Sequence, residues 1–263
     1  MVYHKRIDEL TQATYLCPLR ALAVNPNAVA DTSRVRYNAN DFVETDLHRV
    51  TNIESLADVI VLDWRQKTSG LLSTVFYAAS LTQARMIQQT LVDLGYEFPI
   101  ITGNTPKLKR IEWLEQFEAG QLMGLINFGT LTTGWDSPRM QCLVMARPTM
   151  SPGLFLQVIG RGLRTSPLKT ETLLLDYGEN LRRFGPIERV RPESEDRKRF
   201  LNKEKIKVCP VCDTLLSIYA TECHHCTESF ELPERVSECG ACGSLSDYFA
   251  NNCEVCGESF YDE

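Results

Sequence analysis

The middle of the chain alternates between short apolar runs and longer segments with helical spacing. The apolar runs lie at residues 74–78, 98–101, 122–127, 142–146 and 172–176. The segments between them place an apolar residue at every third or fourth position, as at Ile87, Leu91 and Leu94. This alternation is typical of an α/β domain built on a parallel sheet. We therefore predict five buried strands and three helices in one doubly wound domain.

Capping residues mark where the predicted helices begin and end. Ser80 precedes the first helix and a glutamine stands three residues on, as in a capping box. Thr105 and Ser151 each precede a proline, which is the pattern of an N-cap followed by the first helical residue. Gly95 and Gly120 are expected to end the first two helices. The third helix is predicted to run to about residue 164.

The regions outside this core have weaker patterns. We interpret residues 1–70 as a lead-in and place the doubly wound domain at 71–190. Residues 191–207 form a charged linker, and two small cysteine-rich units follow at 208–232 and 238–263. No run approaches the roughly 18 apolar residues that a membrane span needs, and the N-terminus lacks a signal pattern. The sequence therefore predicts a cytoplasmic protein with no membrane partner.

The net charge of −6 is distributed unevenly along the chain. The 263 residues are 43% apolar and 24% charged, which is typical of an ordinary globular protein. Residues 1–178 carry 17 basic and 17 acidic side chains, and residues 179–207 carry 10 and 6. The tail at 208–263 carries 1 and 11, a net charge of −10. Because binding to a nucleic-acid backbone favours Lys and Arg, this tail is better suited to a protein partner.

Eight of the ten cysteines form two copies of one spacing. Cys-x2-Cys-x10-Cys-x2-Cys covers residues 209–226 and recurs 30 residues later. Four thiolates at this spacing are typical of closed, structural zinc sites. The predicted ligands are Cys209, Cys212, Cys223 and Cys226 in the first unit, and Cys239, Cys242, Cys253 and Cys256 in the second. Units this small have almost no core, so two structural Zn²⁺ ions would supply most of their folding energy.

Other interpretations of the cysteine pattern are weaker. Disulfides are the alternative for paired cysteines, but they suit a secreted chain and not the cytoplasm. His224 and His225 lie inside a complete cysteine pair, so we expect them to be solvated loop residues. Cys17 and Cys142 stand apart from the others. We expect both to be small buried apolar residues, because neither has a His or Lys neighbour that would activate a nucleophile.

The segment LFLQVIGRGLR at 154–164 carries the candidate catalytic residues. Gln157, Arg161 and Arg164 stand at i, i+4 and i+7, so they share one face of the predicted helix. Gly160 and Gly162 each cost about 1 kcal/mol in a helix, which indicates that a backbone or a ligand comes close. A polyphosphate between the two guanidinium groups fits this pattern. Two surface arginines on an amphipathic helix are the alternative.

Several segments of the chain resemble motifs of superfamily 2 nucleic-acid helicases. QVIGRGLR at 157–164 resembles motif VI, LTTGWDSP at 131–138 resembles motif V, and TVFYAAS at 74–80 resembles motif IV. The ITGNT segment, with Arg110 and Phe117, resembles the link between motifs IV and V. Their order and spacing are those of the family's second RecA-like lobe. Longer stretches, such as DTSRVRYNANDFVETDL at 31–47, are most similar to RadD-type bacterial helicases.

The resemblance implies roles for individual residues. Arg161 and Arg164 would be arginine fingers that stabilise charge on the γ-phosphate of ATP, and Gln157 would sense or position that phosphate. Gly134 and Asp136 would line the ribose side of the nucleotide. The residues implied in contacts with the nucleic-acid backbone are Thr132, Thr133, Ser80 and Thr105. Helix capping alone also explains the last two.

The sequence lacks two motifs that a complete helicase carries. It contains no GxxxxGK[ST] phosphate loop and no DExH motif, so this lobe by itself has no group to cradle a triphosphate or hold its Mg²⁺. We expect ATP and Mg²⁺ to bind only together with a DExH-containing first lobe, in cis or in trans. The chain would then be a fragment, a split-gene product or a degenerate partner.

Two classes of function follow from these observations. The first is the second lobe of an ATP-driven DNA helicase or translocase, which acts on single-stranded or forked DNA in repair or recombination. The second is a non-catalytic module in which the lobe is vestigial and the acidic zinc tail docks a protein. Tyr219, Tyr248 and Phe249 keep base stacking on single strands open as another role of the tail. The intact polar face of the motif VI helix favours the first class.

Overall fold

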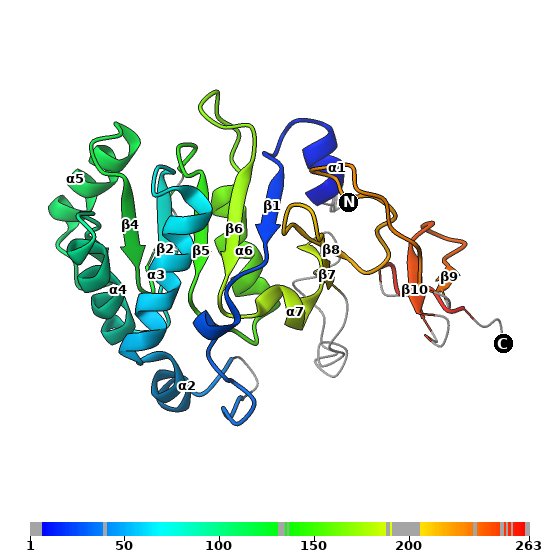
Figure 1. Ribbon diagram of the computed structural model, residues 1–263, viewed down its shortest axis with the longest axis horizontal. Coiled ribbons are helices and arrows are strands. Elements are labelled where there is room, and N and C mark those ends of the chain that lie inside the picture. The colour runs from blue at the N-terminus through cyan, green and yellow to red at the C-terminus, as the bar shows by residue number, and fades with distance from the viewer. Residues whose placement is uncertain are drawn as a thin grey trace.

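The fold consists of one α/β lobe followed by two small cysteine-rich units, which confirms the predicted fold class (Figure 1). The computed structural model describes residues 7–38, 41–130, 135, 137–187, 190, 206–233, 236–247, 250, 252–253 and 255–260. Among these residues, no helix is long and apolar enough to cross a membrane.

Six strands form the sheet of the lobe, in the order β1-β6-β5-β2-β4-β3. Every pairing between neighbouring strands is parallel. The strands are β1 Leu19–Leu22, β2 Thr74–Tyr77, β3 Ile100–Ile101, β4 Gly124–Asn127, β5 Cys142–Met145 and β6 Thr172–Asp176. Strands β2 to β6 lie within the five predicted runs. Strand β1 lies in the segment interpreted as a lead-in, and it pairs with β6 along its whole length.

The helices of the lobe are α1 Ile7–Gln12, α2 Glu44–Thr51, α3 Glu54–Thr68, α4 Leu81–Asp93, α5 Lys107–Glu118, α6 Pro152–Gly162 and α7 Asn180–Phe184, with a 3-10 turn at Pro26–Ala28. The three predicted helices correspond to α4, α5 and α6. Two of the predicted caps are confirmed. The hydroxyl of Ser80 accepts a hydrogen bond from the Gln83 amide at 2.9 Å. That of Ser151 accepts from the Leu154 amide at 3.2 Å.

The start of α5 differs from the prediction. Pro106 occupies the N-cap position and makes no side-chain cap hydrogen bond. Oγ1 of Thr105 instead accepts a hydrogen bond from the Thr102 amide at 2.9 Å. Arg110 donates from Nη2 to the carbonyl oxygens of Thr102 and Thr105 at 3.1 and 3.2 Å. The prediction that Thr105 caps α5 is therefore wrong, because the tight turn after β3 uses its hydroxyl.

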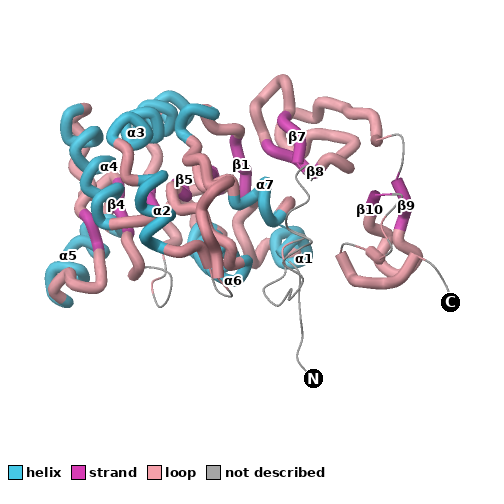
Figure 2. The backbone as a smooth tube through the Cα atoms, turned by 90° about the horizontal axis from the view of Figure 1, so that it is seen from below, coloured by secondary structure: helices cyan, strands magenta, loops and turns pink. Residues whose placement is uncertain are grey.

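Helices cover both faces of the sheet (Figure 2). On one face, α3 and α4 bury Trp64 and Ile87 against Phe76 of β2. On the other face, α5 and α6 bury Phe117 and Phe155 against the same sheet. All residues of β2, β4, β5 and β6 are buried. Burial on both sides explains why these strands appear in the sequence as continuous apolar runs.

Helix α3 belongs to this core although it lies within residues 1–70. Trp64 is fully buried and donates its Nε1 hydrogen to Oγ1 of Thr74 at 3.0 Å. Its ring packs edge-on against Phe76 and Phe98, with centroids 5.5 and 5.6 Å away. The sheet and α3 thus share one core. The domain boundary placed at residue 71 stays a prediction.

The two cysteine-rich units repeat the same small fold. Each contains one antiparallel pair of three-residue strands. These are β7 Ile206–Val208 with β8 Leu215–Ser217, and β9 Val236–Glu238 with β10 Leu245–Asp247. A bridge between Leu22 and Thr214 joins the first unit to the edge of the sheet at β1. In both views β9 and β10 lie beyond the first unit, away from β1 (Figures 1 and 2).

Candidate functional site

Helix α6 carries Gln157 and Arg161, two of the three residues predicted to face a nucleotide, and Arg164 follows its C-cap. Its apolar side, with Val158 and Ile159, is buried in the core that α5 and α6 share. Gln157 and Arg164 are exposed, and Arg161 is partly buried. Helix α6 ends at Gly162, before the predicted end at about residue 164, so helical spacing places Gln157 and Arg161 but not Arg164.

Arg161 is held by the loop that leads into β5. Its Nη1 donates a hydrogen bond to the carbonyl oxygen of Trp135 at 2.8 Å. The Trp135 ring is mostly buried and lies 5.9 Å from the ring of Phe117, centroid to centroid. Burial raises the pKa of Tyr77 on β2 well above its usual value, and the charge of Arg161 opposes that shift. Arg161 thus connects the motif VI helix with the motif V loop and lies close to the motif IV strand.

Four of the predicted contact residues in motif V lie outside the described residues. They are Thr132, Thr133, Gly134 and Asp136. Their roles in binding the nucleic-acid backbone and the ribose therefore stay predictions.

Ser80, another predicted nucleic-acid contact, is buried and hydrogen-bonded inside the lobe. Its hydroxyl accepts from the Gln83 amide and forms a short hydrogen bond with Oδ1 of Asn52, which can only accept. Oε1 of Gln83 in turn accepts from the Ala79 amide at 2.7 Å. Capping of α4 accounts for the bond from Gln83, and the contact with Asn52 links Ser80 to the end of α2. A contact of Ser80 or Thr105 with nucleic acid stays a prediction.

A crevice opens at the carboxyl ends of β2, β4 and β5. Its lining includes Tyr77, Asn127, Arg147 and Leu154. The chain runs from β2 to β3 and β4 on one side and returns to β5 and β6 on the other, so the crevice lies where the strand order reverses. Open α/β sheets bind ligands at such a switch point. The crevice also contains Gly129, near the start of the motif V loop.

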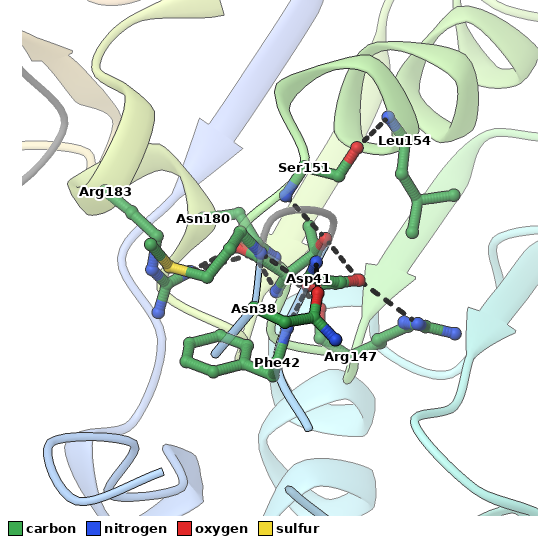
Figure 3. A network of polar contacts seen from close by, with 10 residues as sticks. Asn38, Asp41, Phe42, Arg147, Ser151, Leu154, Asn180 and Arg183 are labelled. Atoms are coloured by element: carbon green, nitrogen blue, oxygen red, sulfur yellow. Dashed lines mark hydrogen bonds and ion pairs between the residues drawn. The ribbon is translucent and has the colours of Figure 1, made fainter. Parts of the chain in front are cut away.

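Asp41 organises the loop between β5 and α6 (Figure 3). Its Oδ2 accepts hydrogen bonds from Nη2 of Arg147 at 3.2 Å and from Oγ1 of Thr149 at 2.9 Å. Its Oδ1 accepts from the Met150 amide at 2.7 Å. One carboxylate thereby fixes the segment that leads into α6. In the sequence, the one signal that marks Asp41 is its place in the RadD-like stretch at 31–47.

Helix α7 completes this network from the other side. Oδ1 of Asn180 accepts from the Thr149 amide at 2.9 Å, and Nη1 of Arg183 donates to the Thr149 carbonyl at 3.0 Å. Nδ2 of Asn180 donates to Oδ1 of Asp176, and the Leu181 amide donates to Oδ2 of Asp176 at 2.7 Å. Burial raises the pKa of Asp176 to about 6, although these hydrogen bonds and the charge of Arg183 oppose the shift.

The glycines of α6 differ in their surroundings. A Cβ added at Gly162 would lie 3.0 Å from Cγ2 of Thr172, because α6 crosses closely over β6 there. The Gly162 carbonyl also accepts a hydrogen bond from Oγ1 of Thr172 at 2.6 Å. A Cβ added at Gly160 would meet nothing within 4 Å. Packing therefore explains Gly162, whereas nothing among the described residues of the lobe requires Gly160.

Each cysteine-rich unit gathers four sulfur atoms that lie within 4.8 Å of one another. In the first unit, the sulfurs of Cys209 and Cys226 are 3.5 Å apart, and those of Cys212 and Cys223 are 3.6 Å apart. The second unit repeats both distances. A zinc tetrahedron with Zn–S bonds of about 2.3 Å has edges of about 3.8 Å. Both groups can therefore hold Zn²⁺, and all ten cysteines are free thiols rather than disulfides.

The remaining histidines and cysteines behave as predicted. His224 and His225 are exposed, and neither belongs to the sulfur cluster. Nδ1 of His225 lies 3.9 Å from a carboxylate oxygen of Glu171. Cys17 and Cys142 are buried. Burial raises the pKa of Cys142 to about 12, so this thiol does not ionise to a nucleophile at neutral pH.

Comparison with known proteins assigns the core of the lobe. Residues 51–166 match the family model of the helicase conserved C-terminal domain. These residues are a helicase C-terminal domain. The chain is 28% identical over 179 residues to IRC3 of Saccharomyces cerevisiae, an ATP-dependent helicase by name. This alignment covers 67% of the chain and 26% of the relative. The chain is also 28% identical over 184 residues to irc3 of Schizosaccharomyces pombe, a mitochondrial ATP-dependent helicase by name. This alignment covers 70% of the chain and 30% of the relative.

A solved structure shares the fold of the helicase C-terminal domain. It is a fragment of an HsdR subunit of a type I restriction enzyme from Vibrio vulnificus, with a TM-score of 0.58 and 19% identity, covering 73% of this chain and 38% of that one. The chain spans less than a third of the length of either yeast relative. The resemblance to the second lobe of superfamily 2 helicases is confirmed. The closer likeness to RadD-type helicases stays a prediction.

The two glycines of α6 give a matched pair of substitutions. Gly160→Ala should raise the free energy of unfolding by about 0.5–1 kcal/mol, because alanine favours the helix and finds open space. Gly162→Ala should lower it by about 1–3 kcal/mol, because the new methyl group presses on Thr172. Urea denaturation of both variants measures the difference. Equal effects of the two substitutions would show that α6 does not pack on β6 as described.

Asp41→Ala should lower the free energy of unfolding by about 2–4 kcal/mol, because the donors on Arg147, Thr149 and Met150 lose their shared acceptor. Asp93→Ala, which removes an exposed carboxylate at the end of α4, is the control and should change it by less than about 0.5 kcal/mol. Chemical denaturation of both variants tests this. Similar small losses in the two would mean that Asp41 does not hold the loop before α6.

Asp176 should give the lobe a specific pH dependence. Its folded pKa of about 6 lies above the ordinary value of 3.8, so the folded protein binds a proton more tightly than the unfolded chain. The resulting stabilisation is complete below the ordinary pKa and is lost as pH rises through about 6. Relative to Asp176→Asn, the wild-type melting temperature should therefore fall across this window. Parallel pH profiles would contradict the raised pKa.

Proposed function

We propose that this chain is the second lobe of an ATP-dependent DNA helicase or translocase. The observation that carries the proposal is the placement of three polar residues in a helicase C-terminal domain. Gln157 is exposed on α6, Arg161 is held against the motif V loop, and Arg164 is exposed just after the helix. A guanidinium placed against a transferring phosphoryl group stabilises the charge that develops on it. A first lobe, in cis or in trans, would supply the phosphate loop and the Mg²⁺ ligands.

The two arginines would contribute in different ways. Arg161 is anchored at Nη1 by the Trp135 carbonyl, which fixes the direction of its guanidinium before a nucleotide arrives. A group that is already oriented requires little reorganisation during the reaction. Arg164 follows the end of α6 and is exposed, so an approaching first lobe can reach its guanidinium. Gln157, which is exposed on α6, would position the phosphate.

The nucleic-acid side of the proposal rests on the motif V loop and the RadD resemblance. Thr132 and Thr133 would contact the backbone of single-stranded or forked DNA, while Gly134 and Asp136 would line the ribose of ATP. Repair or recombination, and a cytoplasmic location, belong to the same proposal. The two Zn²⁺ ions would be structural. The acidic tail would favour a protein partner, with stacking of bases on Tyr219 as the alternative.

The direct test is ATP hydrolysis in the presence of single-stranded DNA. The chain alone should be inactive, because its sequence has no phosphate loop. Activity should appear when the chain is fused behind, or mixed with, a first lobe from a RadD-type helicase. Arg164→Ala should then reduce kcat by about 10³-fold or more, and a melting temperature measured in parallel shows whether the variant is folded.

Arg85→Ala is the matched control, since it removes an exposed arginine from α4 on the other face of the sheet. It should leave hydrolysis unchanged. An inactive fusion whose two lobes are both folded would contradict the proposal and favour a binding module. Hydrolysis by the chain alone would contradict the assignment of Mg²⁺ and phosphate binding to another lobe.

A further inference from the structure

Strand β1 is an edge strand whose outer side needs a partner. It pairs with β6 on one side and is the last strand of the sheet. The backbone N–H and C=O groups on the outer side of an edge strand are open to other chains unless something covers them. Its position in the sheet therefore makes β1 a point where the lobe can lose order or associate.

The first cysteine-rich unit covers this edge with its backbone. The amide of Ala23, directly after β1, donates a hydrogen bond to the carbonyl oxygen of Asp213 at 2.8 Å. Leu22 and Thr214 form an antiparallel bridge. Both contacts on the unit come from the turn that follows the second cysteine of the sulfur cluster, residues 212–214, which we name the first zinc turn.

Arg20 of β1 adds side-chain contacts to the same turn. Its Nε donates to Oγ1 of Thr214 at 3.1 Å, and its Nη2 donates to the carbonyl oxygen of Cys212 at 3.1 Å. Nη1 lies 3.6 Å from a carboxylate oxygen of Glu171 at the start of β6. The other carboxylate oxygen of Glu171 faces His225, which lies between the last two cysteines of the cluster. Both halves of the sulfur cluster thus contact the sheet edge.

The shape of the first zinc turn depends on the cysteine ligands. The Asp213 amide donates to the Cys209 carbonyl at 3.0 Å, and the Cys209 amide donates to the Thr214 carbonyl at 2.9 Å. Asp213 adopts a left-handed conformation, with φ of 57°, which is uncommon for residues other than glycine. A unit with so few buried apolar residues cannot keep this turn closed by packing, so the metal would hold it.

The second unit provides an internal comparison. Its equivalent turn has the same hydrogen bonds, from the Gly243 amide to the Cys239 carbonyl at 2.8 Å and from the Cys239 amide to the Ser244 carbonyl at 2.9 Å. This unit lies beyond the first one and away from β1 (Figures 1 and 2). The two sulfur clusters therefore share their local geometry and differ in their position relative to the lobe.

We propose that the first zinc site is a structural part of the helicase lobe, whereas the second is not. A metal at the first site holds in place the three acceptor oxygens that cover the edge at β1. They are the carbonyl oxygens of Cys212 and Asp213 and Oγ1 of Thr214. Because coupling between the binding free energies of two sites is reciprocal, the contacts with β1 must in turn tighten the binding of this metal. They also hold the turn closed, so the local opening that releases the metal becomes rarer. This coupling does not depend on the proposed ATP-driven function, since neither test below needs a nucleotide.

The first test compares the two sites by removing equivalent ligands in the full chain. Cys209→Ser with Cys212→Ser disables the first site, and Cys239→Ser with Cys242→Ser is the matched control. Hydrogen–deuterium exchange of the peptide that contains β1 and Ala23 should become about tenfold faster or more in the first variant. The same peptide should be unchanged in the control. Equal exchange of this peptide in the two variants would overturn the proposal.

The second test leaves every cysteine in place, so it remains decisive if the ligand variant fails to fold. Zinc release to a colorimetric chelator should show two phases in the wild type. Arg20→Ala should accelerate one of them by about tenfold, because three nitrogen contacts to the turn and to Glu171 are lost. Arg85→Ala should change neither phase. Release kinetics that are the same in Arg20→Ala and in the wild type would overturn the proposal.

Discussion

The lobe depends on how α6 packs against the sheet. Phe155, Val158 and Ile159 are the buried side of this helix, and their burial leaves Gln157 exposed and Arg161 partly exposed on its other side. The two ends of the helix are fixed independently of that packing. At its start, Asp41 holds the preceding loop through the Met150 amide; near its end, the Trp135 carbonyl holds Arg161. The buried side of α6 and these two contacts together determine where Arg161 lies.

Local patterns in the sequence predicted most of the sheet and all three long helices of its core after β2. Buried parallel strands give continuous apolar runs, and Ser80 and Ser151 are caps that act within three residues of the helix they begin. Strand β1 was missed because Arg20 interrupts its apolar run, and the strand is only half buried. Its partner β6 is about 150 residues away, and no local pattern records such a pairing. Thr105 was misassigned because its hydroxyl serves a turn that competes with the helix.

The candidate site was predicted in the same uneven way. The spacing of Gln157, Arg161 and Arg164 follows from helical geometry, and the four-cysteine clusters follow from ligand spacing, so both were accessible from the sequence. Asp41 was not, because its contacts cross more than 100 residues to Arg147 and Thr149. The repeat also predicted two equivalent zinc units. The repeat could not show that the first zinc unit contacts Arg20, since that contact depends on tertiary structure.

The most direct measurement for the central claim is a structure of this chain joined to a first helicase lobe, with ADP and a phosphate analogue bound between them. We expect the guanidinium groups of Arg161 and Arg164 to face the cleft, within hydrogen-bonding distance of the analogue. We also expect the Arg161–Trp135 contact of 2.8 Å to persist. A closed complex in which both arginines face solvent, away from the analogue, would contradict the claim.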